Sequence, residues 1–229
     1  MSDETVDDEI IHGGKLLLPP RGRLRQTGEV DAVDSYYRPG IGWVLRRRLV
    51  WIRDALPAHP LSRVLEVGYG SGVFFYELAR HTTQLVGVEV HANGADVRRR
   101  VAADGITAGL VQASGMALPF RAGTFEAVLI VSALEFMPDP LACLRESLRV
   151  TRPGGRVVVV TPRVLAWADR LYRVLAGFDP ESEFRGGRQR VQRALADPTL
   201  RVERQPRPGG FPRWLAPYEL VVLRPEATE

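Results

Sequence analysis

The sequence predicts an α/β protein with a doubly wound, mostly parallel sheet of seven strands, in which the last strand is antiparallel. Apolar runs of strand length alternate with helical patterns through most of the 229 residues. Two of the runs, 128–131 and 157–160, are apolar at every position, as central parallel strands are. Another, 64–67, stops at three alternating glycines before a helical pattern begins. That arrangement is a strand, a tight turn and a helix start.

The expected elements follow in chain order. Residues 1–30 lack periodicity and should be a flexible leader, whereas 31–229 should form a single domain. A helical pattern from Ala32 to Leu56 is interrupted at Pro39–Gly40. Strands are then expected at 63–67, 84–90, 106–112, 125–131, 155–161, 199–205 and 217–224, with helices at 71–81, 94–104, 138–150, 164–176 and 189–196 and a loop at 178–187. The short link around Pro208–Gly210 permits an antiparallel return of the last strand.

Composition excludes several classes of protein. The 27 acidic residues are interspersed among the 31 basic ones, so we expect no nucleic-acid partner, and Arg46–Arg48 should lie on a solvated helix face. Cys143, the single cysteine, excludes an internal disulfide and should be buried. Met1–Glu9 does not look like a signal peptide, and no run reaches the length of a membrane span. We therefore expect a cytoplasmic protein, with no membrane association and no metal site.

The glycine turn and an acid after the next strand form the first candidate site. Gly68, Gly70 and Gly72 lack a Cβ, so a ligand can approach the backbone closely. Dinucleotide enzymes use the spacing G-x-G-x-x-G, but Val73 occupies the position of the last glycine, which argues against a nicotinamide cofactor. Glu89 ends the next predicted strand, about 20 residues beyond the turn, where a carboxylate can accept hydrogen bonds from both hydroxyls of a ribose.

Further motifs follow in order at Ala117–Phe120, Thr124–Val128, Leu134–Pro140 and Arg149–Gly155. Together with the glycine turn they resemble the successive motifs of the class I S-adenosylmethionine-dependent methyltransferases, in the subgroup with many small-molecule methylating enzymes. The resemblance covers about residues 60–162 and implies a Rossmann-like sheet. By this resemblance, residues 60–162 would form the half of the domain that binds the cofactor. Residues 31–58 and 163–198 would be the substrate-side elements.

The resemblance also implies which residues hold S-adenosylmethionine. The methionine part would lie against Glu66 and the turn, the ribose against Glu89, and the adenine near Val90. Ser114 stands where relatives often carry Asp, so the adenine would depend on the neighbouring backbone and on apolar packing. The full set of expected cofactor residues is Glu66, Gly68, Tyr69, Gly70, Gly72, Glu89, Val90, Ser114, Gly115, Met116 and Val131.

The catalytic residues stay open, because methyl transfer from a sulfonium needs no dedicated base. Glu135 is the one proton-acceptor candidate, and Phe136 stands where relatives often carry His. Tyr36–Arg38 either closes over the cofactor or simply packs. The substrate side carries aromatic residues and arginines, namely Trp167, Tyr172, Phe178, Phe184, Arg185, Arg188 and Arg190.

The expected function is methyl transfer by in-line displacement to an unidentified, small-molecule acceptor. A non-catalytic cofactor-binding assembly or regulatory protein and an RNA or protein methyltransferase are the alternatives. The sequence predicts no particular oligomeric state.

Overall fold

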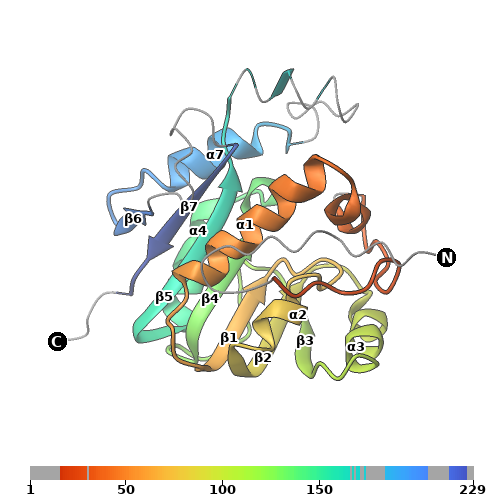
Figure 1. Cartoon of the computed structure of the whole chain (residues 1–229). Helices are drawn as coiled ribbons and strands as arrows, with labels where there is room; N and C mark the ends of the chain where they lie inside the picture. Colours follow the sequence, from red (N-terminus) through yellow and green to blue (C-terminus); the bar gives the residue numbers. More distant parts are fainter. Residues whose placement is uncertain are drawn as a thin grey trace.

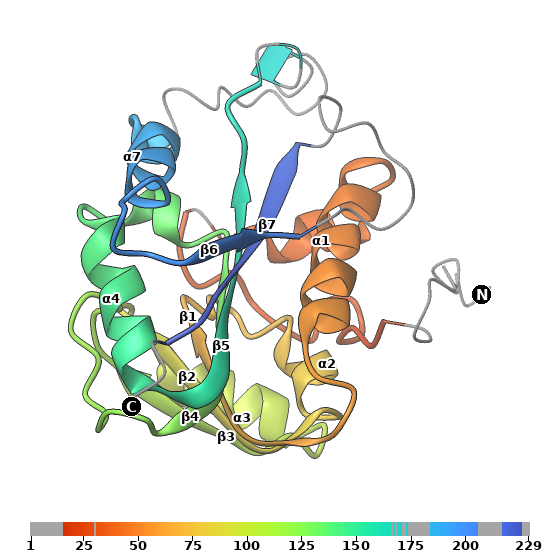
Figure 2. The ribbon, with the colours of Figure 1, turned by 90° about the vertical axis from the view of Figure 1, so that its left-hand side faces the viewer.

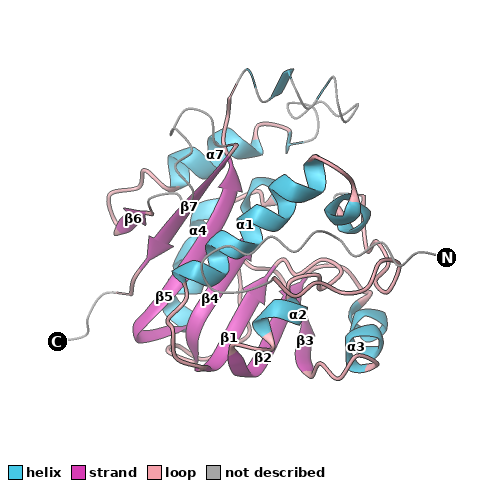
Figure 3. Ribbon diagram, viewed as in Figure 1, coloured by secondary structure: helices cyan, strands magenta, loops and turns pink. Residues whose placement is uncertain are grey.

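The computed structural model describes residues 16–29, 31–165, 167, 169–170, 173, 184–205 and 217–225. Its centre is a seven-stranded sheet in the order β3-β2-β1-β4-β5-β7-β6 (Figure 1; magenta in Figure 3). The strands are β1 Leu61–Val67, β2 Thr82–Glu89, β3 Ala108–Gln112, β4 Phe125–Val131, β5 Thr151–Pro162, β6 Val202–Arg204 and β7 Tyr218–Leu223.

The direction of each strand agrees with the prediction. The first five strands pair in parallel, whereas β7 pairs antiparallel with both β5 and β6, so β7 is the reversed strand. Every predicted strand overlaps an observed one, and β4 has the predicted bounds. β5 begins four residues before the predicted start at 155, because Thr151 already pairs with Phe125 ahead of an irregularity in the register.

Helices cover both faces of the sheet, which confirms the doubly wound architecture. Figure 2 shows α1 and α2 on one side of the sheet and α4 and α7 on the other. The helical elements are η1 Val33–Tyr37, α1 Ile41–Ala55, α2 Phe75–Leu78, α3 Gly94–Ala102, η2 Leu134–Phe136, α4 Pro140–Val150 and α7 Gly187–Ala194. One apolar core contains residues of α1–α3, and a second contains residues of α4 and α7. Cys143 is fully buried in the second core, and this burial raises the pKa of its thiol to about 12.

One helix prediction was partly wrong, and another was confirmed. The pattern at 71–81 yields only the four residues of α2, because the chain is still in the glycine turn up to residue 74. The pattern from Ala32 does break at Pro39–Gly40, where Gly40 adopts φ +73° between η1 and α1. Most of the predicted helix 164–176 and loop 178–187 lies outside the described residues, as does the link 206–216.

Residues 16–29 lie against the domain. Leu24 is buried, the Leu17 N–H donates to Glu77 Oε2 at 2.8 Å, and Arg23 forms an ion pair with Asp104 at 2.8 Å. The boundary expected at residue 30 stays a prediction, since these contacts join both sides of it. Within the described ranges, no helix is long and apolar enough to cross a membrane.

Candidate functional site

The glycine turn follows β1 at the carboxyl edge of the sheet. Gly68 has φ +79°, and a Cβ there would lie 2.4 Å from the Cβ of Ala133. Gly72 has φ +82°, and a Cβ there would lie 2.9 Å from the ring of Phe75. Both the conformation and the close approach therefore require glycine at these two positions. The result is a stretch of bare backbone that faces the loop after β4.

Glu89 is oriented toward this turn from the end of the adjacent strand. One carboxylate oxygen accepts from Gly70 N–H at 3.1 Å, and the other accepts from Val90 N–H at 2.7 Å. Each oxygen has a second lone pair, so both can still accept from a ligand hydroxyl. The parallel pairing of β1 and β2 explains the proximity, because it brings the two strand ends to one edge.

A cavity of about 710 Å³ opens at this edge. Ten of the eleven residues expected to bind the cofactor line it. Gly72 does not line the cavity and instead lies against Phe75, so its contribution is to the shape of the turn. The structure thus brings the predicted residues together, while their contacts with a cofactor stay a prediction.

Ser114 has a local role at one end of the cavity. Its hydroxyl accepts from Met116 N–H at 3.2 Å and so shapes the turn that follows β3. Gly115 is tightly packed there, because a Cβ would lie 2.7 Å from Val67 Cγ1. The backbone of Ser114–Met116 is therefore held against the end of β1, next to Val90 and Glu89.

Glu66 places a buried carboxyl in the wall of the cavity. It is 3% exposed, and its Oε2 has no hydrogen-bond partner among the described residues. Burial, together with the nearby charge of Glu89, raises the pKa of Glu66 to about 8, and Arg48 acts in the opposite direction. Glu66 is therefore mostly protonated at neutral pH and ready to ionise beside a cationic ligand.

Arg48 contradicts the expectation of a solvated arginine face. It is 8% exposed and lines the cavity from α1. One terminal nitrogen donates to Ser132 Oγ at 2.7 Å and the other to the Tyr36 hydroxyl at 2.6 Å. Its guanidinium carbon also lies 5.5 Å from the ring centroids of both Tyr36 and Tyr218. The missed signal is its spacing, since Arg48 lies on the same helical stripe as Leu45 and Ile52.

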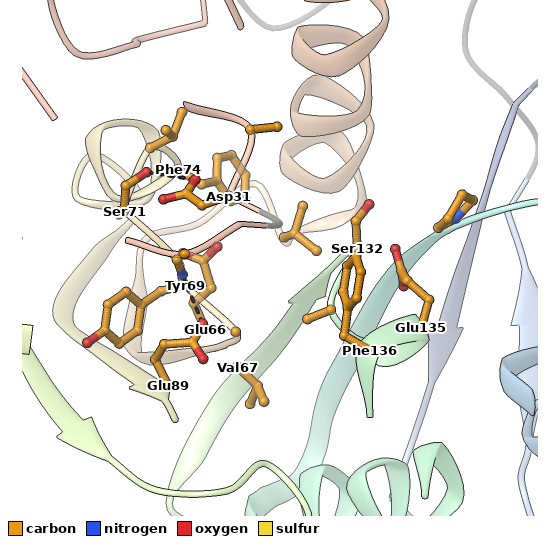
Figure 4. A pocket seen from close by; sticks show the side chains of 18 of the residues that line it. Asp31, Glu66, Val67, Tyr69, Ser71, Phe74, Glu89, Ser132, Glu135 and Phe136 are labelled. Carbon is orange, nitrogen blue, oxygen red and sulfur yellow. Dashed lines mark hydrogen bonds between the residues drawn. The ribbon is translucent and has the colours of Figure 1, made fainter. Parts of the chain in front are cut away.

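Glu135 and Phe136 lie in η2, on the opposite side of the cavity from Glu66 and Glu89 (Figure 4). Glu135 is 1% exposed, and neither carboxylate oxygen has a hydrogen-bond partner among the described residues. Phe136 is 39% exposed, and its ring lies 5.4 Å from that of Phe184. The turn before η2 is strained, because Ser132 adopts φ +49° without being glycine.

The remaining substrate-side candidates fall into two groups. Tyr36, Arg38, Phe184 and Arg188 line the cavity, whereas the Tyr37 hydroxyl donates to Pro19 O at 2.5 Å. Arg188 is buried and paired with Asp169 at 2.6 Å, so it is not a solvated charge. Trp167, Arg185 and Arg190 do not line the cavity, and Tyr172 and Phe178 lie outside the described residues.

No cluster of His, Cys, Asp and Glu in the described part of the chain could hold a metal ion.

Comparison with known proteins identifies the central part of the chain. Residues 65–159 match the family model of a methyltransferase domain. Over 125 residues the chain is 35% identical to a demethylmenaquinone methyltransferase of Beutenbergia cavernae, and the match covers 55% of this chain and 50% of that protein. The chain thus spans about half the length of this relative.

Solved structures share the fold at low sequence identity. The [4+2]-cyclase SpnF superposes with a TM-score of 0.59 at 19% identity, covering 80% of this chain and 81% of that protein. A geranyl diphosphate methyltransferase in complex with GPP and sinefungin gives 0.55 at 18%, covering 77% and 75%. The family match and the relative thus show a methyltransferase domain within residues 65–159 of this chain, and the shared fold agrees with it.

Proposed function

We propose that this protein transfers a methyl group from S-adenosylmethionine to a small-molecule acceptor by in-line displacement. The single observation that carries the proposal is that the glycine turn and Glu89 face one cavity. The same cavity is also lined by Ser132 and by an aromatic chamber, which consists of Tyr36, Phe136, Phe184 and Tyr218. The curated relative from Beutenbergia cavernae is named as a methyltransferase of a small molecule, which supports the choice of acceptor.

The residues of the cavity fit S-adenosylmethionine in a definite order. Glu66 and the backbone of Gly68, Tyr69 and Gly70 would hold the methionine part, and Glu89 the ribose hydroxyls. The adenine would lie between Val90 and the Ser114–Met116 backbone, with Gly72 supporting the turn from behind. Val131 would border the sulfonium, which supplies the reactive methyl group when the cofactor is bound.

The size of the cavity is that of a small-molecule site. Pockets for one small ligand enclose roughly 300–1,000 Å³, and this cavity encloses about 710 Å³. The chain's contribution to the reaction is then to align the acceptor with the methyl group and to exclude water.

We also propose a reducing, cytoplasmic location, which the lone buried Cys143 supports.

Glu89→Ala tests the ribose site. We expect the dissociation constant for S-adenosylhomocysteine, measured by titration calorimetry, to rise by about 100-fold, because two hydrogen bonds to a charged group are lost. Glu203→Ala is the matched control, since Glu203 is an exposed residue of β6 whose one ion pair among the described residues is with Arg224 on the surface. Equal affinity in Glu89→Ala and Glu203→Ala would remove the proposed ribose site.

The acceptor class is tested with S-adenosylmethionine carrying a tritiated methyl group. A lysate incubated with the protein and this donor is separated into small molecules, nucleic acid and protein. We expect the label among the small molecules. Label in nucleic acid or protein would support the macromolecular alternative, and cofactor binding with no labelled fraction would support a non-catalytic role.

A further inference from the structure

Resting on the proposed function, we infer that the acceptor is a planar ring with an acidic hydroxyl, such as a phenol, that Glu135 takes the hydroxyl proton, and that Arg48 stabilises the resulting oxyanion. The inference names the substrate class and two residues that act on it. It depends on the contacts that these two buried groups make and on those that they lack.

Glu135 is a buried acid in the cavity wall whose carboxylate oxygens make no hydrogen bond of normal geometry. The neighbours that act on it are the Thr161 hydroxyl, its own backbone and two arginines. Such a group is costly unless a ligand or a proton satisfies it. Burial raises the pKa of Glu135 to about 7, while Arg48 from α1, Arg188 from α7 and the Thr161 hydroxyl from β5 act in the opposite direction. This places its ionisation in the range suited to a base at neutral pH.

Glu135 is also held firmly in place. Gly187 at the start of α7 lies against the backbone of Glu135, where a Cβ would come within 1.7 Å of the Glu135 carbonyl oxygen. Any larger residue at 187 would separate α7 from η2. The close contact therefore fixes the position from which the Glu135 side chain meets the cavity.

Arg48 supplies the complementary charge. Its terminal nitrogens donate only to the neutral hydroxyls of Ser132 and Tyr36, and its Nε has no partner among the described residues. Arg48 forms no direct ion pair among the described residues, although Glu66 and Glu135 lie near enough for its charge to lower the pKa of each. A buried cation that no carboxylate contacts directly can stabilise negative charge that forms in the cavity beside it.

The walls of the chamber fit a flat ring. Phe136 and Phe184 form one aromatic pair, with centroids 5.4 Å apart. Tyr36 and Tyr218 both lie near the Arg48 guanidinium, whose carbon is 5.5 Å from each ring centroid. All four aromatic residues line the same cavity as Glu135. A ring that stacks among them can direct a hydroxyl toward the acid and the arginine together.

The proposed step balances as follows. The hydroxyl proton passes to the Glu135 carboxylate, and an oxygen lone pair forms the new O–CH₃ bond. The S–CH₃ bond breaks, its electron pair stays on sulfur, and the sulfonium becomes a neutral thioether. Glu135 releases the proton to water when the methyl ether leaves.

The wild-type protein tests the substrate class directly. Tritiated methyl transfer is measured with a panel of phenols (2-naphthol, catechol and 4-nitrophenol) and with benzylamine, benzoic acid and thiophenol. We expect label in the phenols. Transfer confined to the other compounds, or no labelled phenol from a protein that binds S-adenosylhomocysteine, would overturn the inference but leave the cofactor site intact. Failure to bind S-adenosylhomocysteine would instead overturn the proposed function itself.

Glu135→Gln tests the base. We expect kcat for 2-naphthol at neutral pH to fall by about 10²–10⁴-fold, with the affinity for S-adenosylhomocysteine unchanged. The variant should recover as the pH approaches about 10, where the phenol ionises unaided, and should lose much less activity toward the more acidic 4-nitrophenol. Glu203→Gln serves as the control and should match the wild type. An equal loss for both phenols at every pH would show a structural role and contradict the assignment of Glu135.

Discussion

Gly68→Val is expected to abolish the binding of S-adenosylmethionine. The substitution forces a β-branched residue into φ +79° and places its Cβ 2.4 Å from Ala133 Cβ, so the turn and the loop after β4 must move apart. The displaced turn can no longer present its backbone to a ligand. In titration calorimetry we expect no measurable heat of binding at ligand concentrations that saturate the wild type.

Gly154→Val separates the steric clash from the backbone strain. Gly154 also has a positive φ, +76°, but a Cβ there would have no neighbour within 4 Å, and the residue lies outside the cavity. This control should lose about 1–2 kcal/mol of stability from strain alone and bind S-adenosylmethionine normally. Wild-type binding by a folded Gly68→Val protein would show that the turn does not form the cofactor site.

Stability without ligand is expected to fall steeply as the pH rises from about 4.5 to about 8. Glu66 holds its proton to a pKa of about 8 in the folded protein, whereas the ordinary pKa of a Glu side chain is 4.5. Between these values the unfolded chain binds fewer protons than the folded one, so the free energy of unfolding decreases with pH. The loss from this one group is of the order of 5 kcal/mol and is complete above the folded pKa.

Glu66→Gln should remove most of that slope. Urea unfolding at a series of pH values should show the variant close to the wild type near about pH 5 and more stable than it near about pH 9. Part of the slope should persist, because Glu135 titrates in the same direction. A constant difference between the two proteins across the pH range would show that Glu66 does not change its pKa on folding.

The sequence predicts the centre of the sheet well, because the two central strands β4 and β5 contain continuous apolar runs. β4 is the clearest case, since Phe125–Val131 is apolar except at Glu126. The sequence predicts the region of α2 less accurately. Its apolar residues look helical, but the conformation of Gly72 delays the helix to Phe75.

The cofactor end of the site is predictable for a different reason than the acceptor end. Residues such as Glu66 and Glu89 lie at the ends of adjacent strands, so chain order alone brings them together. Arg48 reaches the cavity only because α1 packs across the sheet, and it sits in a run of three arginines that suggests a solvated face. Its burial depends on contacts with Tyr36 and Ser132, which are far from each other in sequence.

The contacts of Arg163 and Gly187 have a consequence for how this protein can diversify. Arg163 N–H donates to Pro217 O at 2.8 Å, and Gly187 is wedged against Glu135, so the chain is anchored just before and just after the segment between them. Phe184 lies in that segment and lines the cavity, so under the proposed function its exchange between homologues would alter the acceptor side without touching the turn or Glu89. Acceptor preference and donor recognition can therefore evolve as separate modules on one scaffold.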